Sequence, residues 1–308
     1  MKIAQIGMGE WGKNHTRILS DLGVLSAVCD SDSQKSNECE KKYSVNHYDS
    51  VDSLVASEDF DGVFVGTNVS AHVEIVTKLL LEKKHVFVEK PIMYDSVEGE
   101  KLKELAQKNE VIFTCGLAER FNPTIEFVKN SVREKKYGDL VMLEFYRESK
   151  SSSHDKKGIV FESSINDIDA ANWIFNEMPI LVFARLCALN NEKEEFASIM
   201  LGYKDNKTAI ILSNGFSSEE IRKLRMVCSG AVVLSDLISQ EIKVSKENSQ
   251  VSLEKKDPIL LQIQNFIGAI EGKNEIVVKP KEVINIAKIA EAALLSSKKG
   301  VPIYLDLK

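Results

Sequence analysis

The stretch KIAQIGMGEWG, residues 2–12, decides the fold of the first part of this chain. It joins a short apolar run to the glycine pattern GxGxxG, and a helix-length segment follows. Gly7 allows a tight turn, Gly9 lets the backbone approach a pyrophosphate, and Gly12 lets the helix pack closely on the strand. The helix N-terminus then offers free N–H groups to the phosphates. In this context the pattern predicts a dinucleotide-binding turn, and a glycine-rich turn without a ligand is the alternative.

Short apolar runs alternate with helix-length segments through residues 1–118. Each run has the length and continuous apolar character of a strand that is buried on both faces of a parallel sheet. This alternation predicts right-handed βαβ units and a doubly wound Rossmann sheet. The expected strands are 2–6, 24–29, 62–65, 85–88 and 111–114, and the clearest helices are 11–21, 69–81 and 96–109.

An acidic residue follows the second expected strand, at Asp30, 18 residues beyond Gly12. A carboxylate at this position accepts hydrogen bonds from the hydroxyls of the adenine ribose. It also repels a 2′-phosphate, and no arginine lies nearby in the sequence to bind that phosphate. The sequence therefore predicts NAD rather than NADP, although an ordinary exposed turn aspartate is the alternative.

Beyond residue 119, short strands follow one another with brief polar turns, which predicts an antiparallel sheet. We therefore expect an α/β fold with two domains: an NAD-binding Rossmann domain over residues 1–118, and an α+β domain with an open, mainly antiparallel sheet over residues 119–308. The expected strands of the second domain are 140–148, 180–189, 197–203, 208–213, 221–228, 232–234 and 241–244, and its expected helices are 123–135, 167–175, 258–271 and 281–299.

The composition excludes several classes of protein. A net charge of −6 argues against binding to nucleic acid or to an anionic membrane surface, which need basic patches. The five cysteines form no CxxC pair, so neither a disulfide framework nor a metal site is indicated. No apolar run reaches the ~18 residues of a membrane helix, and the first residues run straight into a strand. We therefore expect a cytoplasmic protein without a signal peptide.

The fourth expected strand runs into Glu89-Lys90-Pro91. Side chains at the carboxyl end of a buried parallel strand lie where doubly wound sheets bind their ligands. A lysine that is desolvated there and held near a carboxylate can act as a proton donor or base. A surface salt bridge that closes the strand is the alternative, and the three residues alone do not decide between them.

Four motifs, in this order and spacing, resemble the glucose–fructose oxidoreductase / inositol dehydrogenase family. The resemblance covers nearly the whole chain, and the last motif is similar to members that act on nucleotide-linked amino sugars. It implies hydride transfer between a nicotinamide and an alcohol carbon of a sugar, cyclitol or nucleotide sugar, and it makes Lys90 the active-site lysine. The motifs are Gly7-Met8-Gly9-Glu10-Trp11-Gly12, Gly66-Thr67-Asn68 with His72, Glu89-Lys90-Pro91, and Glu119-Arg120-Phe121-Asn122-Pro123.

These motifs, together with Asp30, also supply the residues expected to hold the cofactor. His72 is expected to brace the cofactor loop or cap its helix rather than to do chemistry. His15, on the first helix, and His47 are expected to be structural. The expected cofactor-binding residues are Gly7, Gly9, Glu10, Trp11, Gly12, Asp30, Thr67, Asn68, His72, Glu89 and Lys90.

The chain departs from the family where many members carry Asp, three residues, and then His. Glu162 stands at the Asp position and Asn166 at the His position. A spacing of four would place both on one helical face. An asparagine amide can orient a hydroxyl but cannot exchange a proton at neutral pH. Three alternatives follow: Lys90 acts alone as acid and base, His154 moves in from a polar loop, or the protein does not catalyse.

We rank Lys90 first among these three, with Glu162 and Asn166 beside it at the catalytic centre. Arg120, Asn122, His154 and Asp169 are expected to border the substrate. The leading interpretation is an NAD-dependent dehydrogenase of a sugar, cyclitol or nucleotide sugar. The alternative is a catalytically silent, NAD-binding sensor or regulatory protein on the same fold.

The second sheet is also expected to form an interface between copies of the chain. In the strand from residue 140, Val141, Leu143 and Phe145 point one way, while Met142 and Tyr146 point the other. A sheet with helices on one side only leaves its other face exposed, and an apolar patch of this kind usually marks an interface. Related family members use this face, so we expect a homodimer or homotetramer.

Overall fold

The computed structural model describes residues 1–150, 158–189, 193–245 and 249–307. The chain folds into two compact units. The first joins residues 1–116 to residues 259–284, and the second joins residues 117–258 to the C-terminal segment from Asn285. The expected second domain of residues 119–308 is therefore interrupted, because one late segment of the chain groups with the first unit.

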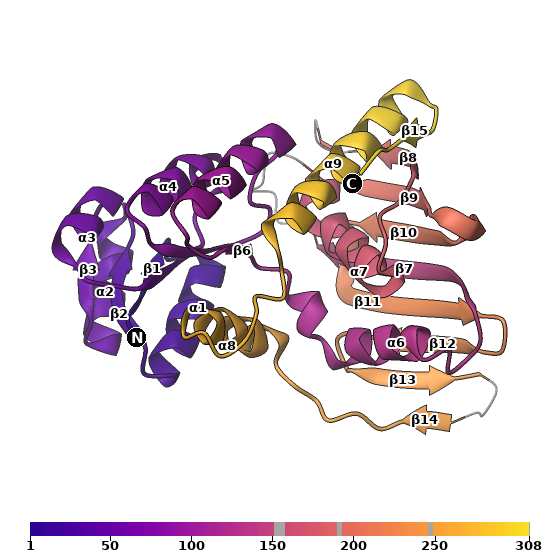
Figure 1. The fold of residues 1–308 in the computed structure, drawn as a ribbon, viewed down its shortest axis with the longest axis horizontal. Helices are drawn as coiled ribbons and strands as arrows, with labels where there is room; N and C mark the ends of the chain where they lie inside the picture. The colour runs from indigo at the N-terminus through magenta and orange to yellow at the C-terminus, as the bar shows by residue number, and fades with distance from the viewer. Residues whose placement is uncertain (151–157, 190–192, 246–248, 308) are drawn as a thin grey trace. The chain divides into compact units, whose positions relative to one another are not determined.

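The first unit contains a six-stranded parallel sheet with the order β3-β2-β1-β4-β5-β6 (Figure 1). This confirms the predicted Rossmann sheet. All four residues of β1 and of β4 are buried, as expected for strands covered on both faces. The strands are β1 (Ile3–Ile6), β2 (Leu25–Cys29), β3 (Asn46–Tyr48), β4 (Gly62–Val65), β5 (His85–Val88) and β6 (Phe113–Cys115).

Five helices connect these strands, and two of them were not predicted. Helix α2 buries only Ser36 and Cys39, so its sequence carries almost no apolar periodicity. Helix α3 has seven residues, and only Leu54 is buried. The helices are α1 (Glu10–Asp21), α2 (Ser33–Tyr43), α3 (Val51–Ser57), α4 (Val69–Leu81) and α5 (Ser96–Lys108).

A helix from late in the chain completes the core of the first unit. Helix α8 (Pro258–Ile270) brings Phe266 against Phe64 and Phe87, with ring centroids 5.2 and 5.8 Å apart. Phe64 and Phe87 are themselves stacked at 4.4 Å. Since this cluster is buried, the Rossmann sheet depends on Phe266, which lies 202 positions after Phe64 and 179 positions after Phe87 in the sequence.

The second unit contains a nine-stranded sheet with the order β14-β13-β12-β11-β7-β10-β9-β8-β15. Neighbouring strands are antiparallel except for β7 and β10, which are parallel. The prediction of an open, mainly antiparallel sheet is therefore confirmed. The strands are β7 (Leu140–Lys150), β8 (Leu181–Cys187), β9 (Phe196–Gly202), β10 (Thr208–Asn214), β11 (Phe216–Cys228), β12 (Val232–Asp236), β13 (Glu241–Val244), β14 (Ser249–Val251) and β15 (Ile303–Tyr304).

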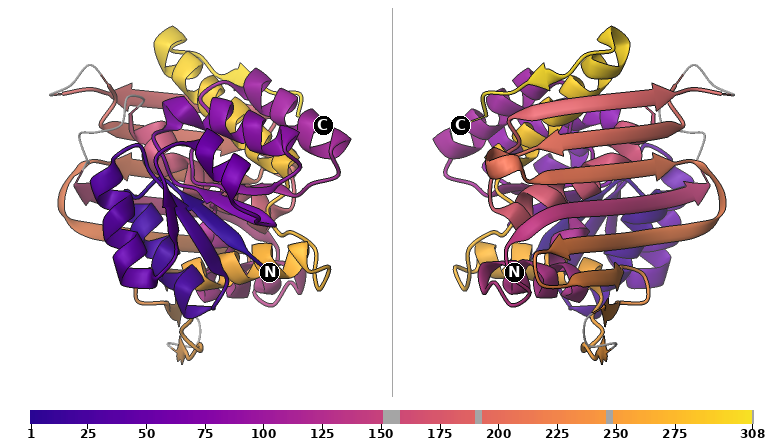
Figure 2. Two further views of the ribbon diagram at one scale, coloured as in Figure 1. Left: turned by 90° about the vertical axis from the view of Figure 1, so that its left-hand side faces the viewer. Right: turned by 90° about the vertical axis from the view of Figure 1, so that its right-hand side faces the viewer.

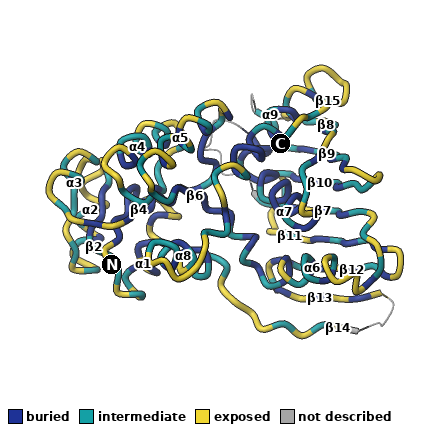
Figure 3. Tube along the Cα trace, in the orientation of Figure 1, coloured by how far each residue is buried: buried dark blue, intermediate teal, exposed yellow. Residues whose placement is uncertain are grey.

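One face of this sheet is covered by helices, and none of the described helices covers the other (Figure 2). The helices are α6 (Pro123–Arg133), α7 (Ile165–Phe175) and the part of α9 (Pro280–Lys299) that belongs to this unit. Nearly every residue of α7 is buried (Figure 3). None of the helices in the described ranges has the length and apolar character to cross a membrane.

Strand β7 shows how the alternation expected from sequence works in the structure. Leu143 and Phe145 are fully buried, whereas Tyr146 is 38% exposed on the open face. Val141 was expected to share a face with Leu143 and Phe145, but it is 50% exposed. Strand β10 begins opposite Met142, and β11 pairs with Met142 and Leu140 but skips Val141, so Val141 has no paired neighbour on either side.

Candidate active site

The turn after β1 is packed so tightly that two of its three glycines exclude any side chain. Gly7 has a φ of +85°, in the left-handed region that favours glycine. A Cβ atom on Gly7 would lie 2.7 Å from the backbone carbonyl of Gly66, and one on Gly12 would overlap the carbonyl oxygen of Gly7. Gly9 differs, because no atom lies within 4 Å of its Cβ position. Two glycines therefore serve packing, and the third borders open space.

The N-terminus of α1 carries no side-chain cap. Gly9 is its N-cap residue, so the first N–H groups of the helix keep their hydrogen-bonding capacity for a ligand. The buried Gln5 supports the turn, since its Nε2 donates to the carbonyl oxygens of Ile6 and Gly7 at 2.9 and 3.1 Å. Glu10 and Trp11 are exposed where the helix begins. Uncapped N–H groups, the helix dipole and the open space at Gly9 together fit a pyrophosphate.

Asp30 lies directly beside this turn. Its Oδ2 accepts a hydrogen bond from the Met8 N–H at 2.6 Å, and its Oδ1 accepts one from the Asp32 N–H at 2.9 Å. Two backbone donors thus fix the carboxylate at the carboxyl end of β2. Each carboxylate oxygen can accept a second hydrogen bond, which leaves capacity for two ribose hydroxyls.

The loop between β4 and α4 packs on the glycine turn. A Cβ on Gly7 would lie 2.8 Å from Cγ2 of Thr67, so Thr67 borders the turn, and Asn68 is the exposed N-cap residue of α4. His72 is fully buried, with its Nε2 3.0 Å from the Thr67 carbonyl oxygen and its Nδ1 3.2 Å from that of Pro91. Burial lowers the pKa of His72, and the carbonyl contacts partly oppose that effect. His72 therefore links the cofactor loop to the segment that carries Lys90.

The end of β5 places a buried carboxylate next to Lys90. Glu89 is 7% exposed, and its Oε2 accepts a hydrogen bond from the Lys90 backbone N–H at 3.2 Å. Its Oε1 lies 3.0 Å from Nε2 of His15, which projects from α1. Gly116 packs on the same carboxylate, since a Cβ there would lie 3.0 Å from both oxygens. The Lys90 side chain itself is partly exposed.

Sheet topology explains why these residues gather. Strands β2, β1, β4 and β5 are adjacent and parallel, so their carboxyl ends lie at one edge of the sheet. The strand order reverses between β1 and β4, and doubly wound sheets bind ligands in the crevice at that point. The glycine turn, Asp30, Thr67 and Lys90 all follow these four strands.

Three residues of the second unit that were expected to border the substrate are buried. Arg120 donates from Nε and Nη2 to the carboxylate of Asp169 at 2.6 to 3.1 Å, and both side chains are 1% exposed. The guanidinium also lies 4.5 Å from the ring centroid of Trp173. Asn122 caps α6, where its Oδ1 accepts from the N–H of Thr124. These contacts give all three side chains partners within their own unit.

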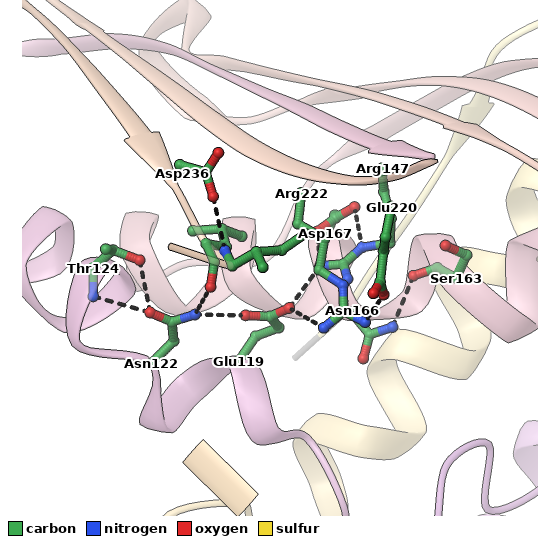
Figure 4. A network of polar contacts seen from close by, with 12 residues as sticks. Glu119, Asn122, Thr124, Arg147, Ser163, Asn166, Asp167, Glu220, Arg222 and Asp236 are labelled. Carbon is green, nitrogen blue, oxygen red and sulfur yellow. Dashed lines mark hydrogen bonds and ion pairs between the residues drawn. The ribbon is translucent and has the colours of Figure 1, made fainter. Parts of the chain in front are cut away.

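A buried charge network, which the sequence analysis missed, surrounds the start of α7 (Figure 4). Arg147 donates to Asp167 through Nε at 3.0 Å and Nη2 at 2.7 Å, and Nη2 also reaches Oε1 of Glu119 at 2.9 Å. Arg222 lies 3.9 Å from the same Glu119 oxygen. Asn122 donates to the other oxygen of Glu119 at 3.2 Å.

Arg147 stays charged despite its burial, whereas burial raises the pKa of the Asp167 carboxyl above its ordinary value. Burial alone would lower the pKa of the Arg147 guanidinium, but the carboxylates of Asp167 and Glu119 outweigh it and raise that pKa above its ordinary value. The alternation of β7 carried a signal for the network. Residues 143, 145 and 147 share one face, so an arginine there predicts a buried ion pair.

The segment from Glu162 to Asn166 is not the continuous α-helix that was expected. Residues Val160–Ser164 form a π-helical turn, and α7 begins only at Ile165, so the spacing of four does not span a regular α-helix. Both side chains are partly exposed, and Nδ2 of Asn166 donates to the Ser163 carbonyl oxygen at 2.9 Å. Glu162 and Asn166 are thus more accessible than Arg120 or Asp169. His154 lies outside the described residues.

The described residues can also be searched for side chains that could ligate a metal ion. Within the described parts of the chain, no group of three or more His, Cys, Asp or Glu side chains has an arrangement that could hold a metal ion. The five cysteines are all free thiols.

Comparison with known proteins agrees with this geometry. Residues 1–117 match the family described as "oxidoreductase family, NAD-binding Rossmann fold". Myo-inositol 2-dehydrogenase of Thermotoga maritima is 27% identical over 68% of this chain and 67% of that enzyme. scyllo-Inositol 2-dehydrogenase (NAD(+)) of Bacillus subtilis is 22% identical over 100% of this chain and 97% of that enzyme.

A solved structure extends the likeness to the whole fold. UDP-N-acetylglucosamine 3-dehydrogenase from Acidithiobacillus ferrooxidans superposes with a TM-score of 0.89 at 20% identity, covering 97% of this chain and 98% of that one. At this identity the likeness shows the fold alone. The two units therefore occur together in other chains of nearly the same length.

We predict that Gly9→Ala and Gly12→Ala fail in different ways. A methyl group on Gly9 meets no protein atom but projects into the space assigned to the pyrophosphate, so the melting temperature should stay within a few degrees while NAD affinity falls at least about tenfold. A methyl group on Gly12 overlaps the Gly7 carbonyl, so this variant should lose stability as well.

Calorimetric titration with NAD and thermal melts of both variants test this prediction. If Gly9→Ala binds NAD as the unaltered protein does, then the pyrophosphate does not lie at Gly9.

Proposed function

We propose that this chain is a member of the NAD-binding oxidoreductase family that its residues 1–117 match, and that it acts as related dehydrogenases do. In this proposal it interconverts a CH–OH group and the corresponding ketone on a sugar, cyclitol or nucleotide sugar. One observation carries this proposal. An uncapped helix N-terminus beside Gly9 and a lysine next to a buried carboxylate follow strands of the same parallel sheet.

NAD is held, in this proposal, by the backbone of the glycine turn and the N-terminus of α1. Asp30 accepts hydrogen bonds from the ribose hydroxyls, while Thr67 and Asn68 border the cofactor from the neighbouring loop. A 2′-phosphate about 4 Å from the Asp30 carboxylate would be repelled by several kcal/mol at an effective dielectric of ~20. This repulsion favours NAD over NADP.

Lys90 is the acid and base. Bound NAD would supply the hydride acceptor for oxidation of the alcohol carbon, and bound NADH would supply the hydride donor for reduction of the ketone. The alcohol oxygen must lose its proton as the hydride leaves, so a titratable group has to lie within ~3 Å of that oxygen. The unprotonated Lys90 amine takes this proton during oxidation, and the ammonium gives it back during reduction.

Glu162 and Asn166 orient the substrate in this proposal. Both side chains are partly exposed at the junction between the π-helical turn and α7. The Asn166 amide can donate to or accept from a hydroxyl but cannot exchange a proton, which leaves the proton transfer to Lys90. Arg120, Asn122 and Asp169 remain candidates to border the substrate, and their buried contacts within their own unit would hold that border in place.

The altered Glu162 and Asn166 pair also favours a second function, a sensor that binds NAD without turnover. The two functions differ in what the purified protein retains. Mass spectrometry of the species released on denaturation distinguishes them, because a retained nucleotide sugar or cyclitol beside NAD supports the enzyme. The same measurement selects the substrate for the kinetic test below.

We predict that Lys90→Met lowers turnover by ~10²–10⁴-fold, the usual contribution of general acid–base catalysis. The substitution keeps the volume of the stem but removes the proton acceptor, so NAD affinity should change little. Asn166→Ala should cost less, mainly as a higher KM, because only hydrogen bonds worth ~1–2 kcal/mol are lost. Steady-state rates and NAD titrations of both variants test the assignment, which is wrong if Lys90→Met keeps near-normal turnover.

The open face of the second sheet supports the proposal of a homo-oligomer. Phe183, Met200 and Ile210 stand side by side across β8, β9 and β10, and Tyr146 stands beside Leu212 one row further along. All five side chains are at least partly exposed. An apolar row of this kind on a face without helices is suited to pairing with a second copy.

We predict that the double substitution Met200→Glu and Ile210→Glu dissociates this oligomer. Two unpaired carboxylates buried in an apolar interface would cost several kcal/mol. Leu81→Glu, at a 60% exposed position in the first unit, is the control and should keep the molecular mass of the unaltered protein. Light scattering at micromolar concentration tests this, and an unaltered protein that is already monomeric would refute it.

A further inference from the structure

His15 was expected to be structural, yet its surroundings are unusual for a core histidine. It is fully buried on α1, with its ring 5.3 Å from that of Phe64 and 5.9 Å from that of Phe87. Its Nε2 lies 3.0 Å from Oε1 of Glu89, a buried carboxylate oxygen. The Nε2–H bond does not point well enough at this oxygen to form a hydrogen bond. Among the described residues, no group forms a hydrogen bond with Nδ1 either.

This arrangement is costly for a residue that only fills the core. A buried polar atom without a well-aligned partner destabilises the folded state, because its hydrogen bonds to water are lost and not replaced. The two phenylalanine rings, which are stacked on each other at 4.4 Å, would pack equally well against an apolar ring. The close approach to Glu89 is the one feature of this position that an apolar side chain would not provide.

Glu89 in turn holds the segment that carries the catalytic lysine. Its second oxygen accepts from the Lys90 N–H at 3.2 Å, and Gly116 makes room for the carboxylate, since a Cβ there would lie 3.0 Å from both oxygens. On the far side of Lys90, the Pro91 carbonyl oxygen lies 3.2 Å from Nδ1 of His72. The Lys90 backbone is thus fixed on both sides, through His15 on α1 and His72 on α4.

We propose that His15 is a positioning residue, which acts through Glu89 to fix Lys90 relative to the N-terminus of α1. This inference rests on the proposed function of Lys90. Helix α1 begins at the glycine turn and carries His15 little more than one turn later. The helix that receives the pyrophosphate therefore also fixes the proton-transferring residue, and His15 touches neither substrate nor cofactor.

Three substitutions separate positioning from packing. His15→Phe keeps a ring but removes the contact with Glu89, His15→Gln places an amide nitrogen near the position of Nε2, and His15→Asn reaches only as far as Nδ1. We expect kcat at saturating NAD and substrate to fall about tenfold or more in the Phe and Asn variants, as for a small misplacement of a catalytic group. The Gln variant should stay within about threefold of the unaltered protein, as its donor is retained.

A second readout needs no substrate. The rate at which acetic anhydride labels Lys90, followed by peptide mass spectrometry at pH 8, reports the reactivity of its amine. Without His15, the Glu89 carboxylate is free to turn toward the Lys90 ammonium and stabilise its charged form. Labelling should therefore slow by about threefold or more in the Phe and Asn variants but not in the Gln variant.

His47→Phe is the matched control, because His47 also lies 3.0 Å from a carboxylate in the same unit, that of Glu40. It should leave both readouts unchanged. If His15→Phe does not fold, the comparison of Gln with Asn decides, and equal values in these two variants overturn the proposal.

The inference and the proposed function fail in distinguishable ways. An unaltered protein without turnover on any substrate contradicts the proposed function, and labelling of Lys90 then decides the role of His15 alone. An active protein whose kcat and Lys90 labelling are unchanged by His15→Phe overturns the inference and leaves the proposed function standing.

Discussion

The close approach of helix α1 to the turn after β1 is the constraint on which the rest of the site depends. Gly12 lies so near the Gly7 carbonyl that no side chain fits between them. This contact fixes the direction of the helix, so that its uncapped N-terminus borders the open space at Gly9. It also brings His15 to Glu89. One packing contact thus orients both the expected cofactor site and the neighbourhood of Lys90.

The second unit depends on a comparable constraint, made of charge rather than of close packing. The guanidinium of Arg147 on β7 holds Asp167 on α7 and Glu119 in the segment before α6. Removing one member of such a buried pair leaves an uncompensated charge and costs about 3–5 kcal/mol. The network therefore holds the start of α7, where Asn166 lies, against strand β7.

Much of the fold could be predicted because local patterns and tertiary structure agree in it. The glycine turn and the buried strands of the first sheet carry their signals within a few residues. Helix α2 carries almost none, because only Ser36 and Cys39 face the core. The return of α8 to the first unit could not be predicted, since Phe266 is apolar in either setting and only its contact with Phe64 decides where it belongs.

The site was predictable to a similar extent. Asp30 and Lys90 follow strands whose carboxyl ends meet, so their place at one edge of the sheet follows from topology. The sequence could not show that Arg120 and Asp169 pair with each other, because they are 49 residues apart. A regular helical spacing for Glu162 and Asn166 was assumed, and the π-helical turn that interrupts it has no clear sequence signature.

Hydride transfer itself is the most direct test of the central claim, that this chain is an NAD-dependent oxidoreductase with its chemistry at Lys90. The protein saturated with NAD⁺ is mixed with cyclitols, hexoses and nucleotide sugars in turn, and absorbance at 340 nm is followed in a single turnover. The account predicts stoichiometric formation of NADH with at least one of these alcohols. Tight binding of NAD⁺ without any increase in absorbance across the whole panel would contradict it.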